Sequence, residues 1–560
     1  MRIAPRQLYV VCAVAAVAAG IVAAVLRAWI CDDAYITYRY AEHLVGGDGL
    51  VFNAGERVEG YTNLSWTVWT ALGMVLGVSP EAWTSFWGIA CYGLTLALLA
   101  WRGWRIATAA GAAAWPLPVA AILGATHVDW ANFATSGLET GAFTLLAFAG
   151  YLLVSPEGPA SDDRRRLVRV AAGGALLALC SLTRPDGVLF AAVCGVWIAA
   201  GRDLRGAIAF GAGFLLLWLP VTAWRIDYYG DLFPNTYYAK SASLSWWSQG
   251  WLYTRLYFAR YWPLLAALPL AWFARPRRAA ALELSLAAVY AAYVARVGGD
   301  FMFARLLVPI TPFVLLLLQR GLVGLSGARP LVHAAATAAL LAAMVLTPSP
   351  VRGKHRPGGI ADEQAVYTRH LAGWGERADR NGARLAAMFD GLPVRVGFFG
   401  AQARLVYRSR VATAIECETG LTDATIARQT LERRGRIGHE KHAQLPYLLE
   451  RRVHLVLARG WANKVLELDR SLPDVPVMLG DVQARLLTWD PEIVAALRAR
   501  GATIPDVPGQ IDRLIARMDR KSPEAVLRDW ERYRLLYFDH VDDPQREAPF
   551  RAKIGLEPRR

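Results

Sequence analysis

The sequence predicts a polytopic α-helical membrane protein with a soluble α/β domain at its C-terminal end. Of the 560 residues, 55% are hydrophobic and the mean hydropathy is +0.27, which is too apolar for an ordinary soluble protein. Charge is distributed unevenly, because residues 1–350 hold 43 charged side chains and residues 351–560 hold 64. The chain therefore divides near residue 350 into a membrane part, 1–350, and an extracytoplasmic domain, 351–560, long enough to bury its own core.

Long apolar segments in the membrane part predict about eleven transmembrane helices, since one span needs roughly 20 apolar residues. The segments lie at about 8–30, 62–101, 107–126, 137–154, 168–200, 206–224, 258–274, 280–296, 304–319 and 330–347. Segment 168–200 is expected to hold two short helices broken at Thr183–Gly187. Segment 62–101 is either two spans or one span with a re-entrant piece. All the basic loops fall on the cytoplasmic side only if 62–101 crosses once, which places the N-terminus inside and the C-terminal domain outside.

Other features of the sequence bear on its compartment and partners. The apolar run Leu8–Ile30 follows a basic start, but no A-x-A-like site precedes Cys31, so we expect an uncleaved first span in the bacterial inner membrane. The six cysteines show neither a disulfide framework nor metal-ligand spacing. The net charge of +15 is consistent with basic loops and with a domain near anionic or phosphorylated lipids. Nucleic acid is not expected as a partner of an outward-facing domain.

The C-terminal domain is expected to mix strands and helices. Apolar β-branched runs predict strands at Val394–Phe399, Val411–Ile415 and Val453–Leu457. Helical periodicity predicts helices at Ala361–Arg377, Asp423–Arg434 and Pro523–Leu536.

The strongest chemical signal is the pair Asp32 and Asp33, which directly follows the first span. The two acids are expected either to cap an interfacial helix flanked by headgroup-level aromatics such as Tyr35, or to supply a carboxylate that deprotonates a sugar hydroxyl. Adjacent helical residues diverge by about 100°, so the pair cannot face each other as two hydrolase carboxylates do. One acid would be the base, and the other would orient the acceptor or hold a cation.

Four further charged residues fall in the predicted outer loops. Glu139 opens a span after Thr135-Ser136-Gly137, and Asp300 and Arg305 follow the Gly298-Gly299 pair. Lys240 ends the run Pro234–Lys240 and could meet a phosphate as a point charge, or it simply snorkels at the interface. Each acid is open to a plain capping or turn role. Their convergence on one side of the membrane is what favours a shared site.

With these motifs the sequence resembles the GT-C fold membrane glycosyltransferases that use polyprenyl-phosphate sugars. Within that group it is most similar to the terminal β-(1→2) arabinofuranosyltransferases of the mycobacterial cell wall and their bacterial relatives. The resemblance rests on Asp32–Tyr40, Gly49–Asn53 with Gly55–Glu59, Thr135–Glu139, Thr183–Gly187, Pro234–Lys240 and Gly298–Met302, and more weakly on Gly420–Asp423 and Gly438–Lys441.

The resemblance implies that a sugar is transferred with inversion from a decaprenyl- or undecaprenyl-phosphate donor to a cell-envelope glycan or glycolipid. The transfer would take place on the outer face of the inner membrane. Arabinofuranose is favoured, with mannose or another sugar as an alternative. Asp32 or Asp33 carries over as the catalytic acid, while Tyr35, Arg39, Glu139, Lys240, Asp300 and Arg305 are expected to bind substrate. No cofactor is required by the sequence, although a divalent cation held with Asp300 is an alternative partner for the phosphate. A lipid-sugar flippase and a non-catalytic membrane scaffold are the competing hypotheses.

Overall fold

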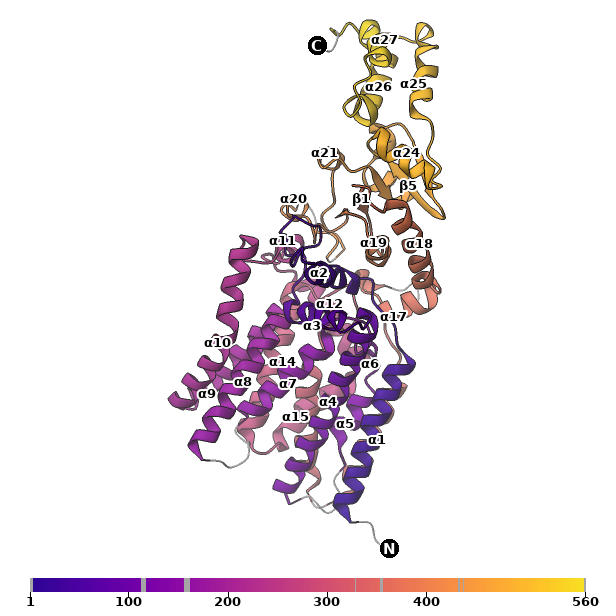
Figure 1. Ribbon diagram of the computed structural model, residues 1–560. Coiled ribbons are helices and arrows are strands. Elements are labelled where there is room, and N and C mark those ends of the chain that lie inside the picture. The colour runs from indigo at the N-terminus through magenta and orange to yellow at the C-terminus, as the bar shows by residue number, and fades with distance from the viewer. Residues whose placement is uncertain are drawn as a thin grey trace.

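The computed structural model describes residues 4–111, 117–155, 162–327, 329–352, 356–431, 434–436 and 438–557. The protein is elongated: a bundle of helices forms one end and a smaller α/β domain forms the other (Figure 1). The N-terminus lies at the free end of the bundle, and the C-terminus lies at the far tip of the domain (Figure 1). The two parts therefore meet along one end of the bundle, where the predicted site residues are found.

The bundle has the features of a multi-pass membrane protein. Among the described residues, six helices are long and apolar enough to span a bilayer: α1 (Pro5–Leu26), α4 (Pro80–Ala109), α8 (Asp163–Thr183), α10 (Leu204–Tyr229), α14 (Arg277–Val297) and Val308–Ser326, which includes α15 (Thr311–Ser326). Shorter apolar helices include α3 (Leu64–Val75), α7 (Thr140–Val154), α9 (Val188–Ala200) and α16 (Pro330–Leu346). The break predicted at Thr183–Gly187 is confirmed between α8 and α9. The number of spans stays a prediction.

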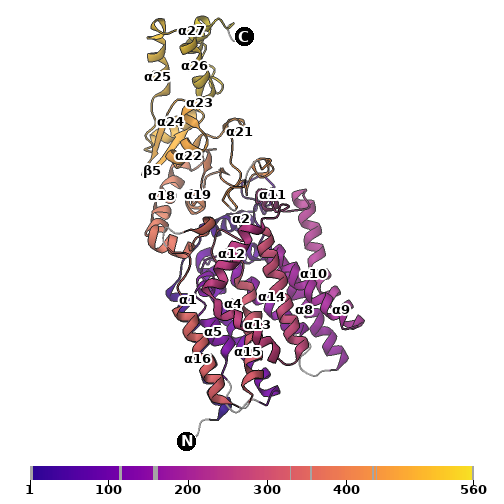
Figure 2. The ribbon, with the colours of Figure 1, turned by 180° about the vertical axis from the view of Figure 1, so that it is seen from behind.

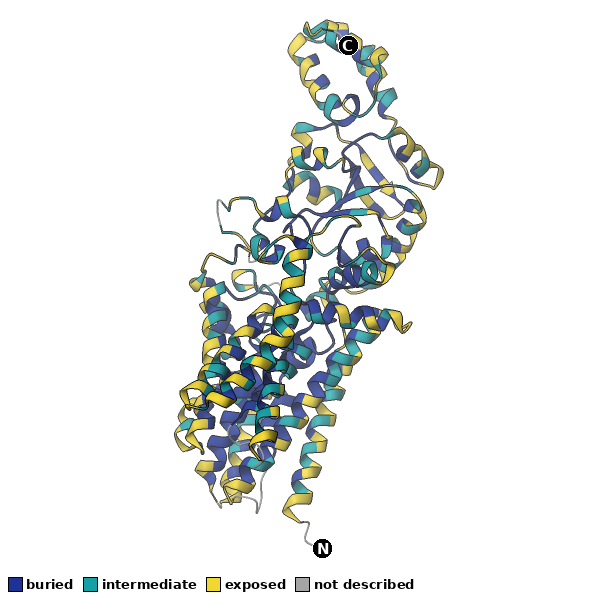
Figure 3. Cartoon of the chain, turned by 60° about the vertical axis from the view of Figure 1, so that its left-hand side comes forward, coloured by how far each residue is buried: buried dark blue, intermediate teal, exposed yellow. Residues whose placement is uncertain are grey.

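The outward faces of the bundle are apolar, as a lipid environment requires. Figure 3 shows exposed positions along the outer helices and buried ones in the centre. On α10, Leu204 is 72% exposed and Leu216 is 79% exposed. A soluble protein does not leave so many large apolar side chains uncovered on one helix.

Segment 62–101 crosses the bundle once. Asn63, at the start of α3, bonds to Glu139, and Glu81, at the start of α4, pairs with Arg408 of the C-terminal domain. Both helix starts therefore lie at the end of the bundle that faces the domain, and only α4 runs through the bundle. α3 is the re-entrant piece.

The arginine-rich loops gather at the opposite end of the bundle. Arg166 of α8 pairs with Asp203 at the start of α10, and Arg320 of α15 donates to the carbonyl of Arg275 over 2.9 Å. Arg102 of α4 donates to Ser155 Oγ at the end of α7 over 2.9 Å. This single-sided clustering is the pattern that the positive-inside rule predicts for the cytoplasmic end.

Glycines let two of the bundle helices approach closely. A Cβ at Gly174 of α8 would overlap the carbonyl oxygen of Phe210, and a Cβ at Gly213 of α10 would overlap that of Ala171. In lipid, where the hydrophobic effect does not drive helices together, association depends on close van der Waals packing. Small residues at the interface allow that packing. The α8–α10 pair therefore depends on these two positions.

The C-terminal domain is built on a five-stranded sheet in the order β2-β1-β3-β5-β4. β1 (Arg395–Phe398), β2 (Thr413–Glu416) and β3 (Leu455–Leu457) are parallel, and they match the three predicted strands. β4 (Pro476–Leu479) and β5 (Val482–Leu486) form an antiparallel hairpin that the sequence prediction missed. The parallel strands require crossovers, which α19 (Ala403–Ser409) and α21 (Leu445–Glu450) provide.

The predicted helices of the domain were only partly correct. α26 (Pro523–Tyr533) lies within the predicted Pro523–Leu536. The helix predicted at Ala361–Arg377 is instead the short α17 (Glu363–Ala365), a π turn and then α18 (Trp374–Phe389). Of the helix predicted at Asp423–Arg434, only the short α20 (Ala424–Ala427) is found, and residues 432 and 433 lie outside the described residues. The segment also contacts the outer loops, through Asn235 and Asp231.

The first outer loop is part of the domain core. Tyr40, Phe52 and Tyr61 are buried together with residues of the sheet, and the Phe52 ring stacks on Phe398 at a centroid distance of 6.3 Å. The domain is thus seated on the bundle by apolar packing as well as by polar contacts. From behind, α16 is seen rising along the bundle toward this junction (Figure 2).

Gly213→Leu should disrupt the α8–α10 contact, because the new side chain has no room beside Ala171. We expect a loss of about 1–3 kcal/mol, the usual result of overpacking, seen as a lower Tm in detergent. Gly211→Leu on the same helix is the matched control, since a Cβ there meets no atom within 4 Å. Equal losses in the two variants would contradict the close-packing account.

Candidate active site

The two aspartates lie in the turn between α1 and α2 (Ala34–Gly46), and the structure separates their roles. The Asp32 carboxylate is buried at 2% exposure and faces the C-terminal domain. Its two oxygens accept the backbone N–H groups of Ala403 and Arg404, over 2.8 and 2.9 Å. Asp32 therefore accepts hydrogen bonds from two N–H groups at the start of α19, which have no partner within that helix. Burial raises the pKa of Asp32 to about 7, although the two N–H donors act against this rise.

Asp33 points to the other side of the turn. Its carboxylate accepts no hydrogen bond from any residue that the structure describes, and the side chain is only half-buried. Burial raises its pKa above the ordinary value, against the attraction of the positive charges of Arg305, His439 and Lys240. Asp33 is thus an accessible carboxylate whose pKa is raised, as a general base needs, and cationic side chains lie near it.

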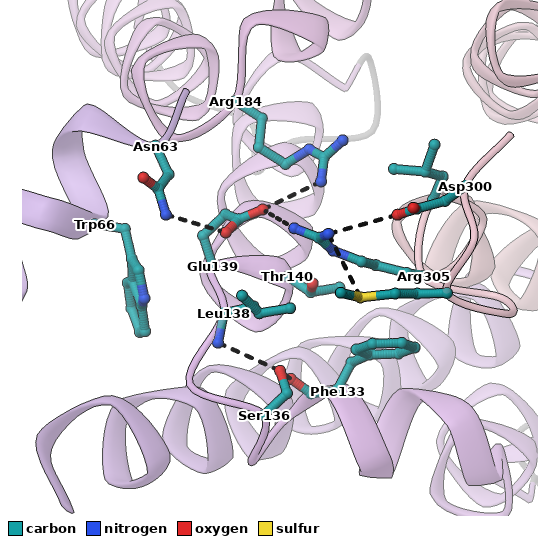
Figure 4. A network of polar contacts seen from close by, with 12 residues as sticks. Asn63, Trp66, Phe133, Ser136, Leu138, Glu139, Thr140, Arg184, Asp300 and Arg305 are labelled. Carbon is teal, nitrogen blue, oxygen red and sulfur yellow. Dashed lines mark hydrogen bonds and ion pairs between the residues drawn. The ribbon is translucent and has the colours of Figure 1, made fainter. Parts of the chain in front are cut away.

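Behind Asp33 lies a buried network centred on Glu139, which precedes the first turn of α7 (Figure 4). Glu139 Oε1 accepts from Arg184 and Arg305, each over 3.1 Å, and Oε2 accepts from Asn63 Nδ2 over 3.2 Å. Arg305 also faces Asp300 at 3.5 Å. The two guanidinium groups compensate the charge of the buried Glu139 carboxylate. Glu139 in turn fixes both arginines.

Arg184 extends this network into the break between α8 and α9. Its guanidinium pairs with both oxygens of Asp186, at 3.1 Å each, and Tyr290 of α14 donates to Asp186 over 2.5 Å. Arg184-Pro185-Asp186 is therefore an ion pair satisfied within the protein. Through its contact with Glu139, Arg184 joins this pair to the network of the site.

The loop that carries Asp300 and Arg305 is fixed from two sides. Gly298 and Gly299 have φ values of +95° and +74°, which glycine adopts without strain. Beyond them, Phe303 N–H donates to the Ala361 carbonyl over 2.9 Å, and Ala361 N–H donates to Phe301 over 2.7 Å. These backbone bonds join the loop to the start of the C-terminal domain.

Lys240 follows α11 (Asn235–Ala239), a helix held between the bundle and the domain. The Asn235 amide donates to the carbonyls of Gly420 and Leu421 over 2.9 and 2.8 Å. Lys240 itself makes no side-chain hydrogen bond or ion pair with the described residues, and its side chain is accessible. Protein nevertheless surrounds the ammonium group, and this lowers its pKa, while Asp300 and Asp33 favour its charge. Lys240 is a cation available to a ligand.

Two predicted substrate-binding residues lie away from this cluster. Tyr35 is fully buried between Tyr38 and Tyr407, with the Arg404 guanidinium 5.2 Å from its ring centroid. Arg39 is also buried, and it donates to the carbonyls of Phe52 and Val411 over 2.6 and 2.8 Å. Both residues join α2 to the C-terminal domain, so the structure assigns them to the interface between the two parts.

The C-terminal domain adds residues near Asp33 that sequence reasoning left out of the site. Glu363 at the start of α17 is buried, and burial together with the charge of Asp33 raises its pKa to about 7. Arg436 and His439 lie against opposite parts of the Phe301 ring, each at 5.0 Å from its centroid. Gly438–Lys441 was noted only as a weak resemblance, and no periodicity signals that this loop folds back over the bundle.

The described residues contain no group of three or more His, Cys, Asp or Glu side chains arranged to hold a metal ion. Asp33, Asp300 and Glu363 influence one another electrostatically, but they are interleaved with Lys240 and Arg305. Lys240 and Arg305 supply positive charge at the site.

The helical bundle with an α/β domain at one end has the GT-C fold of membrane proteins, as a comparison with solved structures shows. The solved structure of ArnT from Cupriavidus metallidurans bound to undecaprenyl phosphate has this fold, with a TM-score of 0.55 at 13% identity. The alignment covers 85% of this chain and 97% of ArnT. The apo structure of ArnT gives the same TM-score at 14% identity.

Two curated relatives are similar in sequence, and both are described as terminal β-(1→2)-arabinofuranosyltransferases. The Mycobacterium tuberculosis protein is 31% identical over 339 residues, which is 53% of this chain and 53% of the relative. The Corynebacterium glutamicum protein is 31% identical over 328 residues, covering 50% of this chain and 46% of the relative. The chain thus spans about half the length of the curated relatives it matches. No family model matches the sequence.

Glu139→Gln should strongly destabilise the protein, because Arg184 and Arg305 would then be buried without their shared counter-ion. Breaking one side of a buried ion pair costs about 3–5 kcal/mol. Glu81→Gln, which breaks a half-exposed pair with Arg408, should cost about 0–1 kcal/mol. Thermal unfolding of both variants in detergent measures the difference, and similar Tm values would contradict the central role of Glu139.

Proposed function

We propose that this protein is an inverting glycosyltransferase that moves a sugar, preferably arabinofuranose, from a polyprenyl-phosphate donor to a cell-envelope glycan or lipid. One observation carries the proposal: the accessible Asp33 carboxylate faces the accessible Lys240 ammonium and the fixed guanidinium of Arg305. A carboxylate base beside two cations suits removal of a proton from a sugar hydroxyl and departure of a phosphate. The likeness to the two arabinofuranosyltransferases supports the reaction class.

The reaction is a single displacement. Asp33 takes the proton of the acceptor hydroxyl as its oxygen attacks the anomeric carbon of the donor sugar. The bond from that carbon to the phosphate oxygen breaks, and the polyprenyl phosphate leaves with the electron pair. Lys240 and Arg305 stabilise the charge that develops on the phosphate, in a position held by the protein before the reaction starts. Attack opposite the leaving group inverts the configuration of the anomeric carbon.

The lipid part of the donor fits the location of the site. The Asp33 turn begins where α1 ends, so a polyprenyl chain in the bilayer would lie beside the bundle with its phosphate at the bundle end. ArnT, which shares the fold, has been solved with undecaprenyl phosphate. Because the arginine-rich loops lie at the opposite end, the reaction would take place on the outer face of the inner membrane.

The donor assignment is tested by offering the purified protein a panel of decaprenyl-phosphate sugars, including arabinofuranose and mannose, with a short glycan acceptor. We expect one donor to be consumed with formation of a glycosidic bond. If vesicles containing the protein move these lipids across the bilayer but no bond forms, the chain is a transporter instead.

Asp33→Asn and Asp32→Asn separate the roles of the two neighbours. Loss of a general base lowers kcat by about 10²–10⁴-fold, so Asp33→Asn should show this loss without altered domain seating. In Asp32→Asn, the amide nitrogen cannot accept, so one α19 N–H loses its partner at a cost of about 1–3 kcal/mol. This variant should release the C-terminal domain more readily in limited proteolysis.

The reverse pattern would assign the base to Asp32: a full loss of kcat in Asp32→Asn with unchanged proteolysis, and an active Asp33→Asn enzyme. The pH profile is a second measurement. Asp33 must be deprotonated to act, so kcat/KM should rise with pH through a midpoint above the ordinary aspartate value of 3.8. Lys240→Met should move that midpoint to higher pH, because it removes a positive charge that favours the carboxylate.

A further inference from the structure

Glu363 belongs to the C-terminal domain, but its segment is held against two outer segments of the bundle. It begins α17, which lies at the junction of the two parts (Figure 1). Just before it, Ala361 forms the two backbone hydrogen bonds to the loop between α14 and α15. Just after α17, the Tyr367 ring stacks on Trp29, in the turn between α1 and α2, at a centroid distance of 5.8 Å. Glu363 is therefore fixed between that loop and that turn.

The Glu363 side chain is buried but has no partner. Glu363 is 8% exposed, and its carboxyl group makes no hydrogen bond or ion pair within the described part of the chain. Both carboxyl oxygens nevertheless keep some accessible surface. The neighbouring Asp362, by contrast, accepts the N–H of Ala365 over 3.1 Å. Because buried polar groups are almost always hydrogen-bonded, an unpartnered carboxyl group with accessible oxygens indicates a place for a ligand.

The electrostatic surroundings of Glu363 place it beside the proposed base. Burial contributes most to the rise of its pKa, and among the charged groups Asp33 contributes most. The charges of Lys240 and Arg305 are among the largest that act on Asp33, but they are not among the largest that act on Glu363. Glu363 therefore lies near the base and farther from the two cations that would meet the donor phosphate.

This position corresponds to the acceptor side of the proposed displacement. The acceptor oxygen attacks opposite to the leaving phosphate, so the two cations and Asp33 would lie on opposite sides of the reacting carbon. A group beside Asp33 therefore meets the acceptor sugar and not the phosphate. A carboxyl group suits a sugar hydroxyl in either protonation state, because it accepts hydrogen bonds when ionised and can also donate one when protonated.

We propose that Glu363 binds a hydroxyl of the acceptor sugar other than the hydroxyl that Asp33 deprotonates. The inference rests on the proposed transferase function and adds a specificity-determining residue to it. The acceptor would need at least two free hydroxyls at its reacting end. A site built to hydrogen-bond a hydroxyl rejects an analogue that lacks it, because the buried group of the protein is then left without its partner. Glu363 would thus select acceptors and leave donor binding unchanged.

Thermal unfolding of the full chain in detergent is the first test, because it needs no substrate. An ionised, unpartnered Glu363 disfavours the folded state, where its pKa is about 7, against an ordinary value of 4.5 in the unfolded chain. The penalty is absent below about pH 4.5 and complete above about pH 7. Glu363→Gln should therefore raise Tm at about pH 8 and change it little at about pH 4.5. The other titratable and charged groups around residue 363 are the same in this variant: Cys31, Asp33, Asp300, Arg356, Tyr367 and Arg436.

Asp362→Ala is the matched control, because this neighbouring acid holds the N–H of Ala365. Its Tm should fall at both pH values. A Tm of Glu363→Gln that is unchanged or lower at about pH 8 would show that the carboxylate contributes to the fold, and would overturn the proposal.

The second test measures kcat/KM with arabinofuranosyl and mannosyl disaccharides and with analogues that each lack one hydroxyl. In the wild type, the analogue without the reacting hydroxyl should give no product. One other analogue should lose about 10- to 100-fold, the effect of one hydrogen bond to a charged group. Glu363→Ala should lose the same factor on the complete acceptor and nothing further on that analogue, with a donor KM changed less than about twofold. Glu363→Gln keeps hydrogen-bonding atoms and should lose less. Additive losses would contradict a direct contact.

Equilibrium binding of the labelled disaccharides separates this inference from the proposed function. If no donor is consumed, the proposed function fails, whereas weaker binding by Glu363→Ala than by the wild type still supports Glu363 as a sugar ligand. Absence of wild-type binding in both series, or equal binding by the two proteins, would refute that role.

Discussion

The site depends on the requirement that charges buried at the end of a membrane bundle must be compensated. Glu139 meets this requirement for two arginines from different parts of the chain, and Asn63 completes its coordination. Through these contacts α3, α7, the α8–α9 break and the loop before α15 converge on one carboxylate. Arg305 is thereby held facing the space beside Asp33 and Lys240. The reactive groups are placed by a network that itself needs no ligand to be satisfied.

The C-terminal domain completes this arrangement instead of merely lying near it. It contributes Glu363, Arg436 and His439 around the outer loops, and its sheet takes Phe52 of the first outer loop into its core. Along the sequence, the boundary between the membrane part and the C-terminal domain is predicted near residue 350, shortly after the end of α16, where charged residues become more frequent. In space, however, the segment between α1 and α3 belongs to both parts. The residues of the candidate site therefore belong to one folded unit.

Much of this organisation could be predicted from the sequence. Hydropathy and the side bias of arginine located the bundle, the single crossing of 62–101 and the broken helix at Thr183–Gly187, because burial in lipid imposes strong local constraints. The candidate site was predicted only in part. Glu139, Lys240, Asp300 and Arg305 converge, but Tyr35 and Arg39 are interface residues, because their partners lie in the domain more than 360 residues away. Glu363 and His439 were missed for the same reason: only tertiary contacts bring them to Asp33.

The turn that carries the two aspartates has a consequence for how this enzyme class can change. Asp32 and Asp33 have the same side chain but point in different directions. Asp32 binds the start of α19 in the C-terminal domain, and Asp33 lies near Lys240 and Arg305. A residue inserted between Asp33 and the start of α2 would turn both carboxylates by about 100° relative to that helix, and both contacts would change in one step. A point substitution in this turn therefore affects one of the two contacts, whereas a change of its length affects both. The distance of the two acids from α2 therefore matters as much as their identity.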